Sequence, residues 1–142
     1  MHDIEIIGFA PSVYVRAVRL ACEEKGISYS LRQTPPHEGE AEELHPFGKI
    51  PVLRHGDFVL CESRAITGYL DDVFEGPRLF PDDPVLKART EEWISFVNTT
   101  IDPTMIRRYY VELMLPTGAG GAPNRALIDS LLPAMERQVG VI

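Results

Sequence analysis

The hydrophobic pattern of the first half of the chain switches between strand-like and helix-like spacing. Residues 4–7 (IEII) are rich in β-branched side chains and stop at a glycine, which predicts a first strand. A helical repeat follows, with Lys25 as its expected polar exit, and its apolar positions are Tyr14, Ala17, Val18, Ala21 and Cys22. Residues 27–32 (ISYSLR) alternate apolar and polar, which predicts a half-buried second strand.

The next segment predicts a hairpin and a second amphipathic helix. Residues 34–43 are polar and rich in Pro and Gly, so we expect a loop with at most a short helix. The apolar runs 52–54 and 58–60 flank a turn centred on Gly56, which is typical of an antiparallel hairpin. Ser63 is expected to cap a helix whose buried face is Ala65, Ile66, Tyr69, Leu70 and Val73. Strand, helix, strand and hairpin in this order predict a mixed four-stranded sheet with helices on its faces.

A change of composition separates this part from a helical second half. Residues 75–83 (EGPRLFPDD) carry two prolines and form the clearest linker. Pro84 occupies the favoured first position of a helix that continues to about Leu115. Asp102-Pro103 should kink this helix or break it locally, since proline lacks the N–H that a helix interior needs.

The last segment predicts one more helix after a glycine-rich loop. Residues 116–123 (PTGAGGAP) read as a loop, and Asn124 can cap a helix that carries Leu127, Leu131, Met135 and Val139. We therefore predict a sheet-containing domain over residues 1–76, a linker over 77–84 and a partial all-helical domain over 85–142.

Composition and charge narrow the classes of partner. The chain has 142 residues and a formal net charge of −7, which argues against nucleic acid because phosphate binding needs a basic surface. No apolar run approaches the roughly 20 residues of a membrane span, and the start lacks the apolar core of a secretory signal. We expect a cytoplasmic protein without a membrane partner. The two cysteines, Cys22 and Cys61, lie far apart, and no Cys/His cluster has metal-ligand spacing, so neither a disulfide nor a metal is expected.

The segment LHPFGKIPVLRHGDFVLCES carries the most informative candidate chemistry. Pro51 should stand at a strand entrance, because it cannot donate a ladder hydrogen bond. A cis Ile50-Pro51 bond would turn the Ile50 backbone toward a ligand, which could pair with it as an added strand. The alternative is an ordinary loop that enters an edge strand. Lys49 is either a solvated lysine or the partner of a terminal carboxylate.

Two further positions have both a structural and a functional interpretation. Glu62 and Ser63 are either a strand end with a helix cap, or a pair that holds an ammonium and a carboxylate at a helix N-terminus. Ser12 is either the N-cap of the first helix or the donor of a hydrogen bond to a ligand thiolate. An open strand edge beside a helix N-terminus suits a small acidic peptide.

Other polar and aromatic residues favour structural roles. The histidines should face solvent rather than take part in catalysis; they are His2, His37, His45 and His55. Cys22 falls on the buried side of the first helix and should behave as a small hydrophobe. Trp93 and Phe96 read as a core pair.

Taken together, these residues resemble the glutathione S-transferases, in serine-type, phi-like or related bacterial members. The segments GFAPSVYVRAVRLACEEKGISY, HPFGKIPVL, GDFVLCESRAITGYL and RLFPDDPVLKARTEEWISF follow the order of that family, densely up to about residue 100. The resemblance implies a thioredoxin-like domain followed by an all-helical domain. It implies that Ser12 stabilises the glutathione thiolate, that Lys49 and the Ile50 backbone hold the glycine and cysteinyl units, and that Glu62 and Ser63 hold the γ-glutamyl end.

The implied activity is attack of the glutathione thiolate on a small hydrophobic electrophile, in a homodimer. The alternatives are a non-catalytic module that joins partners, or a glutathione-dependent peroxidase, dehalogenase or isomerase. Two features depart from the family pattern. Ala41 stands near the place of a loop histidine, for which His37 could substitute, and the chain stops before most of the expected second-domain helices. We therefore expect either a fragment or a shortened member that covers its apolar surface by oligomerising.

Overall fold

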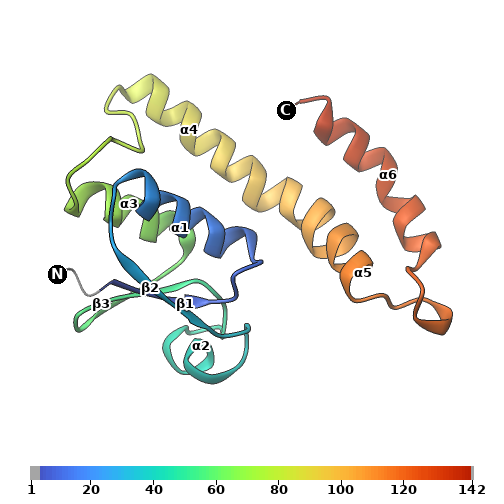
Figure 1. The fold of residues 1–142 in the computed structure, drawn as a ribbon. Coiled ribbons are helices and arrows are strands. Elements are labelled where there is room, and N and C mark those ends of the chain that lie inside the picture. The colour runs from blue at the N-terminus through green and yellow to red at the C-terminus, as the bar shows by residue number, and fades with distance from the viewer. Residues whose placement is uncertain (1–3, 142) are drawn as a thin grey trace. The chain divides into compact units, whose positions relative to one another are not determined.

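Four strands form one mixed sheet in the order β2-β1-β3-β4 in the computed structural model, which describes residues 4–141 (Figure 1). The strands are β1 (Ile4–Gly8), β2 (Tyr29–Gln33), β3 (Val52–His55) and β4 (Phe58–Cys61). β1 runs parallel to β2 and antiparallel to β3, and β3 pairs antiparallel with β4. The predicted mixed four-stranded sheet is confirmed.

Three helices accompany this sheet, namely α1 (Val13–Glu24), α2 (Gly39–Leu44) and α3 (Ser63–Val73). α1 and α3 lie on one face of the sheet and α2 lies beyond the other (Figure 1). The core between the sheet and the helices is apolar, because the periodic positions of each element point inward. It contains Ile4, Ile6, Val15, Val18, Ala21, Cys22, Ile27, Leu53, Ile66 and Leu70.

Several local predictions for this first unit were wrong in detail. The second strand begins at Tyr29, and Ile27 is buried in the connection that precedes it. Lys25 is no polar exit: its ammonium is buried and lies 3.0 Å from the Asp71 carboxylate. Charge pairing explains this burial, since an unpaired ammonium would not tolerate it. On α3, Ile66 and Leu70 are buried as predicted, but Ala65 and Val73 are exposed.

The chain divides into two compact units between Asp82 and Asp83. The second unit begins with α4 (Pro84–Phe96) and continues without interruption into η1 (Val97–Tyr110) and α5 (Val111–Met114). η1 is a π-helix with Pro103 inside it. Proline has no N–H and crowds the carbonyl of the preceding turn, and a wider turn relieves the crowding. The predicted break thus takes the form of a change in helix type.

The rest of the second unit comprises a short 3₁₀ turn, η2 (Ala119–Gly121), and the helix α6 (Arg125–Val139). As predicted, Asn124 caps α6, and its Oδ1 accepts a hydrogen bond from Leu127 N at 3.1 Å. Leu131 is buried as expected, but Val139 is exposed. Near the end of α6, Gln138 Nε2 donates to the Thr100 carbonyl oxygen of η1 at 3.0 Å, which joins the two helices.

Candidate functional site

The strand register brings three segments of the predicted site to one edge of the sheet. Val52 pairs with Ile7 on one side and with Cys61 on the other. Because both pairings are antiparallel, the residue before Val52 and the residues after its two partners lie side by side. These neighbours are Gly8, Pro51 and Glu62. The edge therefore joins the exit of β1, the entrance of β3 and the exit of β4, and both α1 and α3 begin close to it.

Ser12 lies at the start of α1 and caps it. Its backbone N–H donates to the Phe9 carbonyl oxygen at 2.9 Å, which fixes the turn after β1. Its Oγ accepts from Val15 N at 3.5 Å, a long hydrogen bond. The residue is half-buried. The N-cap interpretation is thus realised, and the geometry leaves the hydroxyl proton uncommitted to the cap.

The Lys49–Pro51 segment passes close to the end of β1. The Ile50-Pro51 peptide bond is cis. Ile50 is half-buried against the core, and a side chain at Gly8 would meet both Val15 and Ile50. A glycine at the end of β1 therefore lets Val15 of α1 pack closely against the strand, with Ile50 in contact beside it. Lys49 is exposed, with its Nζ 5.9 Å from the centre of the Phe47 ring.

Glu62 and Ser63 form the start of α3, but their roles differ from the prediction. Ser63 is the first helical residue, and Glu62 is the N-cap, with a positive φ of 71°. The Glu62 side chain makes no capping hydrogen bond. Its carboxylate instead projects into solvent and is 71% exposed. A negative side chain and the N-terminus of an 11-residue helix consequently stand next to each other at the edge of the sheet.

His45 contradicts the prediction that the histidines face solvent. Its side chain is 3% exposed, and its Nε2 lies 3.6 Å from Glu62 Oε1. His55 is half-buried and bonds Tyr69 Oη through Nδ1 at 2.9 Å, whereas His37 is exposed. His2 lies outside the residues that the structure describes. His45 stands in a loop between Leu44 and Pro46, outside any periodic pattern, and Pro46 was the only hint of a fixed turn.

A network of four charged side chains ties α2 to the sheet. Glu5 of β1 pairs with Arg32 of β2 at 2.7 Å and with Arg54 of β3. Glu40 of α2 forms ion pairs with the same two arginines, at 2.8 Å from Arg32 and 2.9 Å from Arg54, and it accepts a hydrogen bond from Arg54. The hydrogen bond from Arg54 lowers the pKa of the Glu40 carboxyl. α2 leads into the loop with Lys49, so this network helps to fix the Lys49–Pro51 segment.

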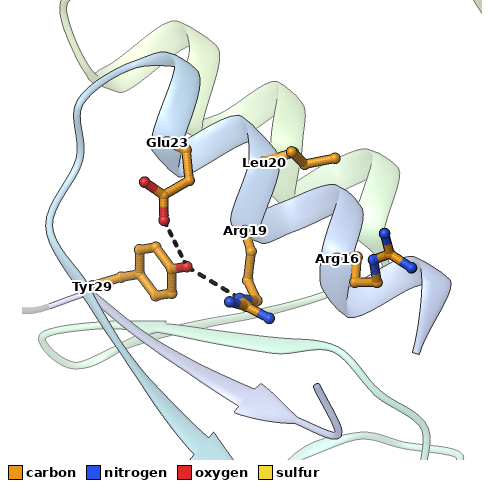
Figure 2. Close-up of a pocket in the computed structure, with 5 residues that line it drawn as sticks. All are labelled: Arg16, Arg19, Leu20, Glu23 and Tyr29. Atoms are coloured by element: carbon orange, nitrogen blue, oxygen red, sulfur yellow. Dashed lines mark hydrogen bonds between the residues drawn. The ribbon is translucent and has the colours of Figure 1, made fainter. Parts of the chain in front are cut away.

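A shallow depression of about 160 Å³ lies between α1 and the start of β2 (Figure 2). Its walls are formed by Arg16, Arg19, Leu20, Glu23 and Tyr29. Tyr29 Oη accepts from Arg19 Nε at 3.1 Å and donates to Glu23 at 3.0 Å, as the dashed lines in Figure 2 mark. The bond to Tyr29 raises the pKa of Arg19. None of the sequence-predicted site residues lines this depression.

The two thiols of the chain are poor candidates for chemistry. Burial raises the pKa of the Cys22 thiol to about 12, and the Glu23 charge adds to this effect. Burial likewise raises the pKa of Cys61, whose Sγ lies 3.7 Å from the Leu44 carbonyl oxygen. The thiolate is the reactive form, so neither cysteine is activated. Within residues 4–141, no group of three or more His, Cys, Asp and Glu is arranged to hold a metal ion.

Among the helices between residues 4 and 141, none combines the length and the apolar character that crossing a membrane requires.

Comparison with known proteins identifies the family. The sequence model of the glutathione S-transferase N-terminal domain matches residues 6–78, which is more than half of the chain. The chain belongs to the glutathione S-transferase family. Among its relatives, glutathione S-transferase U1 of Arabidopsis thaliana is 34% identical over 103 residues, covering 70% of this chain and 46% of the relative. Mouse glutathione S-transferase theta-3 is 28% identical over 127 residues, covering 85% and 53%.

Solved glutathione S-transferases share the fold. The theta-class enzyme of Xanthomonas axonopodis pv. citri, crystallised with glutathione bound, has a TM-score of 0.82 and 26% identity, covering 98% of this chain and 68% of that one. The predicted thioredoxin-like domain followed by a helical domain is thereby confirmed. The chain spans about half the length of the curated glutathione S-transferases that it matches.

Proposed function

We propose that this protein is a glutathione transferase that binds glutathione along the edge formed by Gly8, Pro51 and Glu62. The observation that carries the proposal is the convergence, at that edge, of two helix N-termini with an exposed lysine and an exposed carboxylate. These groups complement a tripeptide with a carboxylate at each end and one ammonium. Family membership supports the same ligand.

The binding roles follow from charge and exposure. Lys49 is exposed and would pair with the glycine carboxylate. The Ile50 backbone, held beside Pro51, would pair with the cysteinyl unit as an added strand. Glu62 would take the γ-glutamyl ammonium, and Ser63 with the first N–H groups of α3 would take its carboxylate, because helix N-termini favour anions. These assignments leave the cysteinyl sulfur near the start of α1.

Ser12 would then stabilise the sulfur as a thiolate. A serine hydroxyl has one donor and two lone pairs, so Ser12 Oγ can accept from Val15 N and still donate its proton. The donated hydrogen bond and the N-terminus of α1 both favour the charged form of the thiol. The thiol proton passes to solvent, and the sulfur electron pair forms a bond to the electrophilic carbon. In a substitution, the leaving group departs with the electrons of the bond that breaks.

The first test is binding followed by conjugation. The protein should be retained on immobilised glutathione and should conjugate glutathione to 1-chloro-2,4-dinitrobenzene, with release of chloride. Ser12→Ala should lose most of its turnover while retention persists. Ser30→Ala, an exposed serine of β2, is the matched control and should keep its turnover. Unchanged turnover in Ser12→Ala would remove the role given to this hydroxyl.

Other outcomes separate the rival functions. Retention without conjugation of any electrophile would support a non-catalytic binding module. Turnover with a peroxide, a haloalkane or an isomerisable substrate alone would point to the corresponding glutathione-dependent reaction. The proposal also includes a homodimer in the cytoplasm, which light scattering and localisation of a tagged protein would check.

A further inference from the structure

We infer that His45 is a positioning residue for the γ-glutamyl end of glutathione, acting through the Glu62 carboxylate. The inference rests on the proposed function, and it assigns a role to a buried polar side chain beside the proposed site. His45 follows α2, whereas Glu62 precedes α3, so the contact joins two separate parts of the edge. Its Nε2 and Glu62 Oε1 are 3.6 Å apart.

Three hydrogen bonds hold His45 in place. Its backbone N–H donates to the Ala41 carbonyl oxygen at 3.1 Å, and its own carbonyl oxygen accepts from Gly48 N at 2.9 Å. Its Nδ1 accepts from Phe47 N at 3.0 Å. The ring is therefore fixed at the backbone and at one of its nitrogens, and the other nitrogen has a defined direction.

The bond from Phe47 also sets the tautomer of the ring. A nitrogen that accepts from a backbone N–H carries a lone pair, so the proton of the neutral imidazole is on Nε2. That N–H faces the Glu62 carboxylate. At 3.6 Å the contact is longer than a normal hydrogen bond and acts as an attraction between a dipole and a charge.

The two ends of this contact differ sharply in exposure. The His45 side chain is 3% exposed, and the Glu62 side chain is 71% exposed. Within residues 4–141 the Glu62 carboxylate has no second polar partner. A buried neutral donor restricts where the carboxylate points without cancelling its charge. An arginine or lysine at this place would compete with the ammonium of the ligand, which a neutral imidazole does not.

Two substitutions separate this role from a purely structural one. In His45→Asn, the amide oxygen can still accept from Phe47 N, but the donor toward Glu62 is lost. In His45→Gln, the side-chain amide reaches farther and can restore that donor. The ligand probes are glutathione and glutaryl-cysteinyl-glycine, which has the same shape but lacks the ammonium. Calorimetry or fluorescence titration gives the dissociation constant of each.

We expect His45→Asn to weaken glutathione binding roughly threefold to tenfold, the range of one lost hydrogen-bond-like contact, and to leave the binding of glutaryl-cysteinyl-glycine unchanged. His45→Gln should recover most of the affinity for glutathione. In a Glu62→Gln background, His45→Asn should have no further effect. Equal weakening for both ligands, or no weakening for either, would overturn the inference and leave the proposed function intact. A wild-type protein that binds neither ligand would overturn the proposed function itself.

A measurement on the wild-type protein covers the case in which His45→Asn does not fold. Nitrogen-15 NMR should find the His45 proton on Nε2, and glutathione should shift that resonance more than glutaryl-cysteinyl-glycine does. A proton on Nδ1, or identical shifts with the two ligands, would contradict the inference.

Discussion

The two units of the chain are stabilised in different ways. In the first unit, helices and strands bury a continuous apolar core, with Ile6, Val15 and Leu53 fully buried. In the second, within the described residues, the buried apolar side chains are Ile128 and Leu131, while Trp93 and Phe96 are each 41% exposed. The second unit also buries two carboxylates, Asp102 and Glu112. The unit that contains the proposed glutathione site thus has a closed apolar core, whereas the helical unit has a sparse one.

The largest effect should come from the buried ion pair of the first unit. Lys25 and Asp71 are both buried, and Asp71 also accepts from Leu79 N at 2.9 Å and Phe80 N at 3.1 Å. Asp71→Asn leaves the Lys25 ammonium without its counter-charge, which should cost about 3–5 kcal/mol of unfolding free energy. Urea unfolding followed by circular dichroism measures this loss. Asp72→Asn, on the exposed neighbour, should change little.

A double variant and the pH dependence of stability provide two further tests of the Lys25–Asp71 pair. Adding Lys25→Met to Asp71→Asn should restore part of the stability, because no unpaired charge is left. Burial would raise the pKa of the Asp71 carboxyl, but the hydrogen bonds from Leu79 N, Lys25 and Phe80 N outweigh it and lower the pKa. The folded state therefore binds this proton less tightly than the unfolded state. The stabilisation is present above the unfolded pKa, near 3.9, and is lost as pH falls through the lowered folded value.

The next largest effect tests the sparse core of the second unit. Leu131→Ala removes a side chain that is almost fully buried, which should cost about 2–4 kcal/mol. Leu132→Ala, on the exposed neighbour, is the matched control and should stay within about 0.5 kcal/mol. Trp93, the single tryptophan of the chain, reports on this unit by fluorescence. Equal losses in the two variants would show that the unit has no defined core.

A smaller effect is expected at the carboxylate that closes the glycine-rich loop. Glu112 is buried and accepts from Thr117 N, Thr117 Oγ1 and Asn124 N, each at 2.8 Å. The backbone hydrogen bonds from Asn124 and Thr117 are the main reason that the pKa of this carboxyl is lowered. Its stabilisation should hold above the unfolded pKa and fade as pH falls through the folded one.

The variant Glu112→Gln isolates this contribution. It should speed amide hydrogen exchange in residues 116–124 and reduce the acid sensitivity of the second unit. If the variant speeds exchange in the first unit alone and leaves residues 116–124 unchanged, the role given to Glu112 is contradicted.

The smallest effect concerns the start of α6. Asn124→Ala removes the capping oxygen for Leu127 N, which should cost about 1 kcal/mol. Asn124→Ser, which keeps a capping oxygen, should recover most of this loss. A thermal melt monitored by Trp93 fluorescence would measure both variants.

Sequence patterns predicted the first unit better than its polar contacts. Residues 4–7 are rich in β-branched side chains and the hairpin after Pro51 has two apolar runs around Gly56, so these strands could be predicted. Lys25 was misjudged because its burial depends on Asp71, a partner distant in sequence. His45 was misjudged because the loop folds back on its ring, where Phe47 N donates to Nδ1. In the second unit, the helix start at Pro84 and the cap at Asn124 could be predicted from local chemistry. The π-helix could not be predicted in this way, since it depends on how a whole helix adjusts to one proline.

The candidate site could be predicted in part, because some of its features follow from local sequence patterns. The order of Ser12, Lys49–Pro51 and Glu62–Ser63 along the chain suggested a ligand, and the register of β1, β3 and β4 places the last two segments beside the end of β1. The sequence did not predict which residue caps α3. A serine at a strand-to-helix junction predicts a cap, but the backbone turns one residue earlier, at Glu62.

Titration of the bound glutathione thiol shows directly whether the protein stabilises the thiolate. Thiolate absorbance near the ultraviolet edge, followed against pH in saturating protein, gives the pKa of that sulfur. We predict a pKa well below the roughly 8.5 of a free thiol, and a return toward that value in Ser12→Ala with glutathione still bound. A bound thiol that titrates as it does in free solution, in the wild-type protein, would contradict the account.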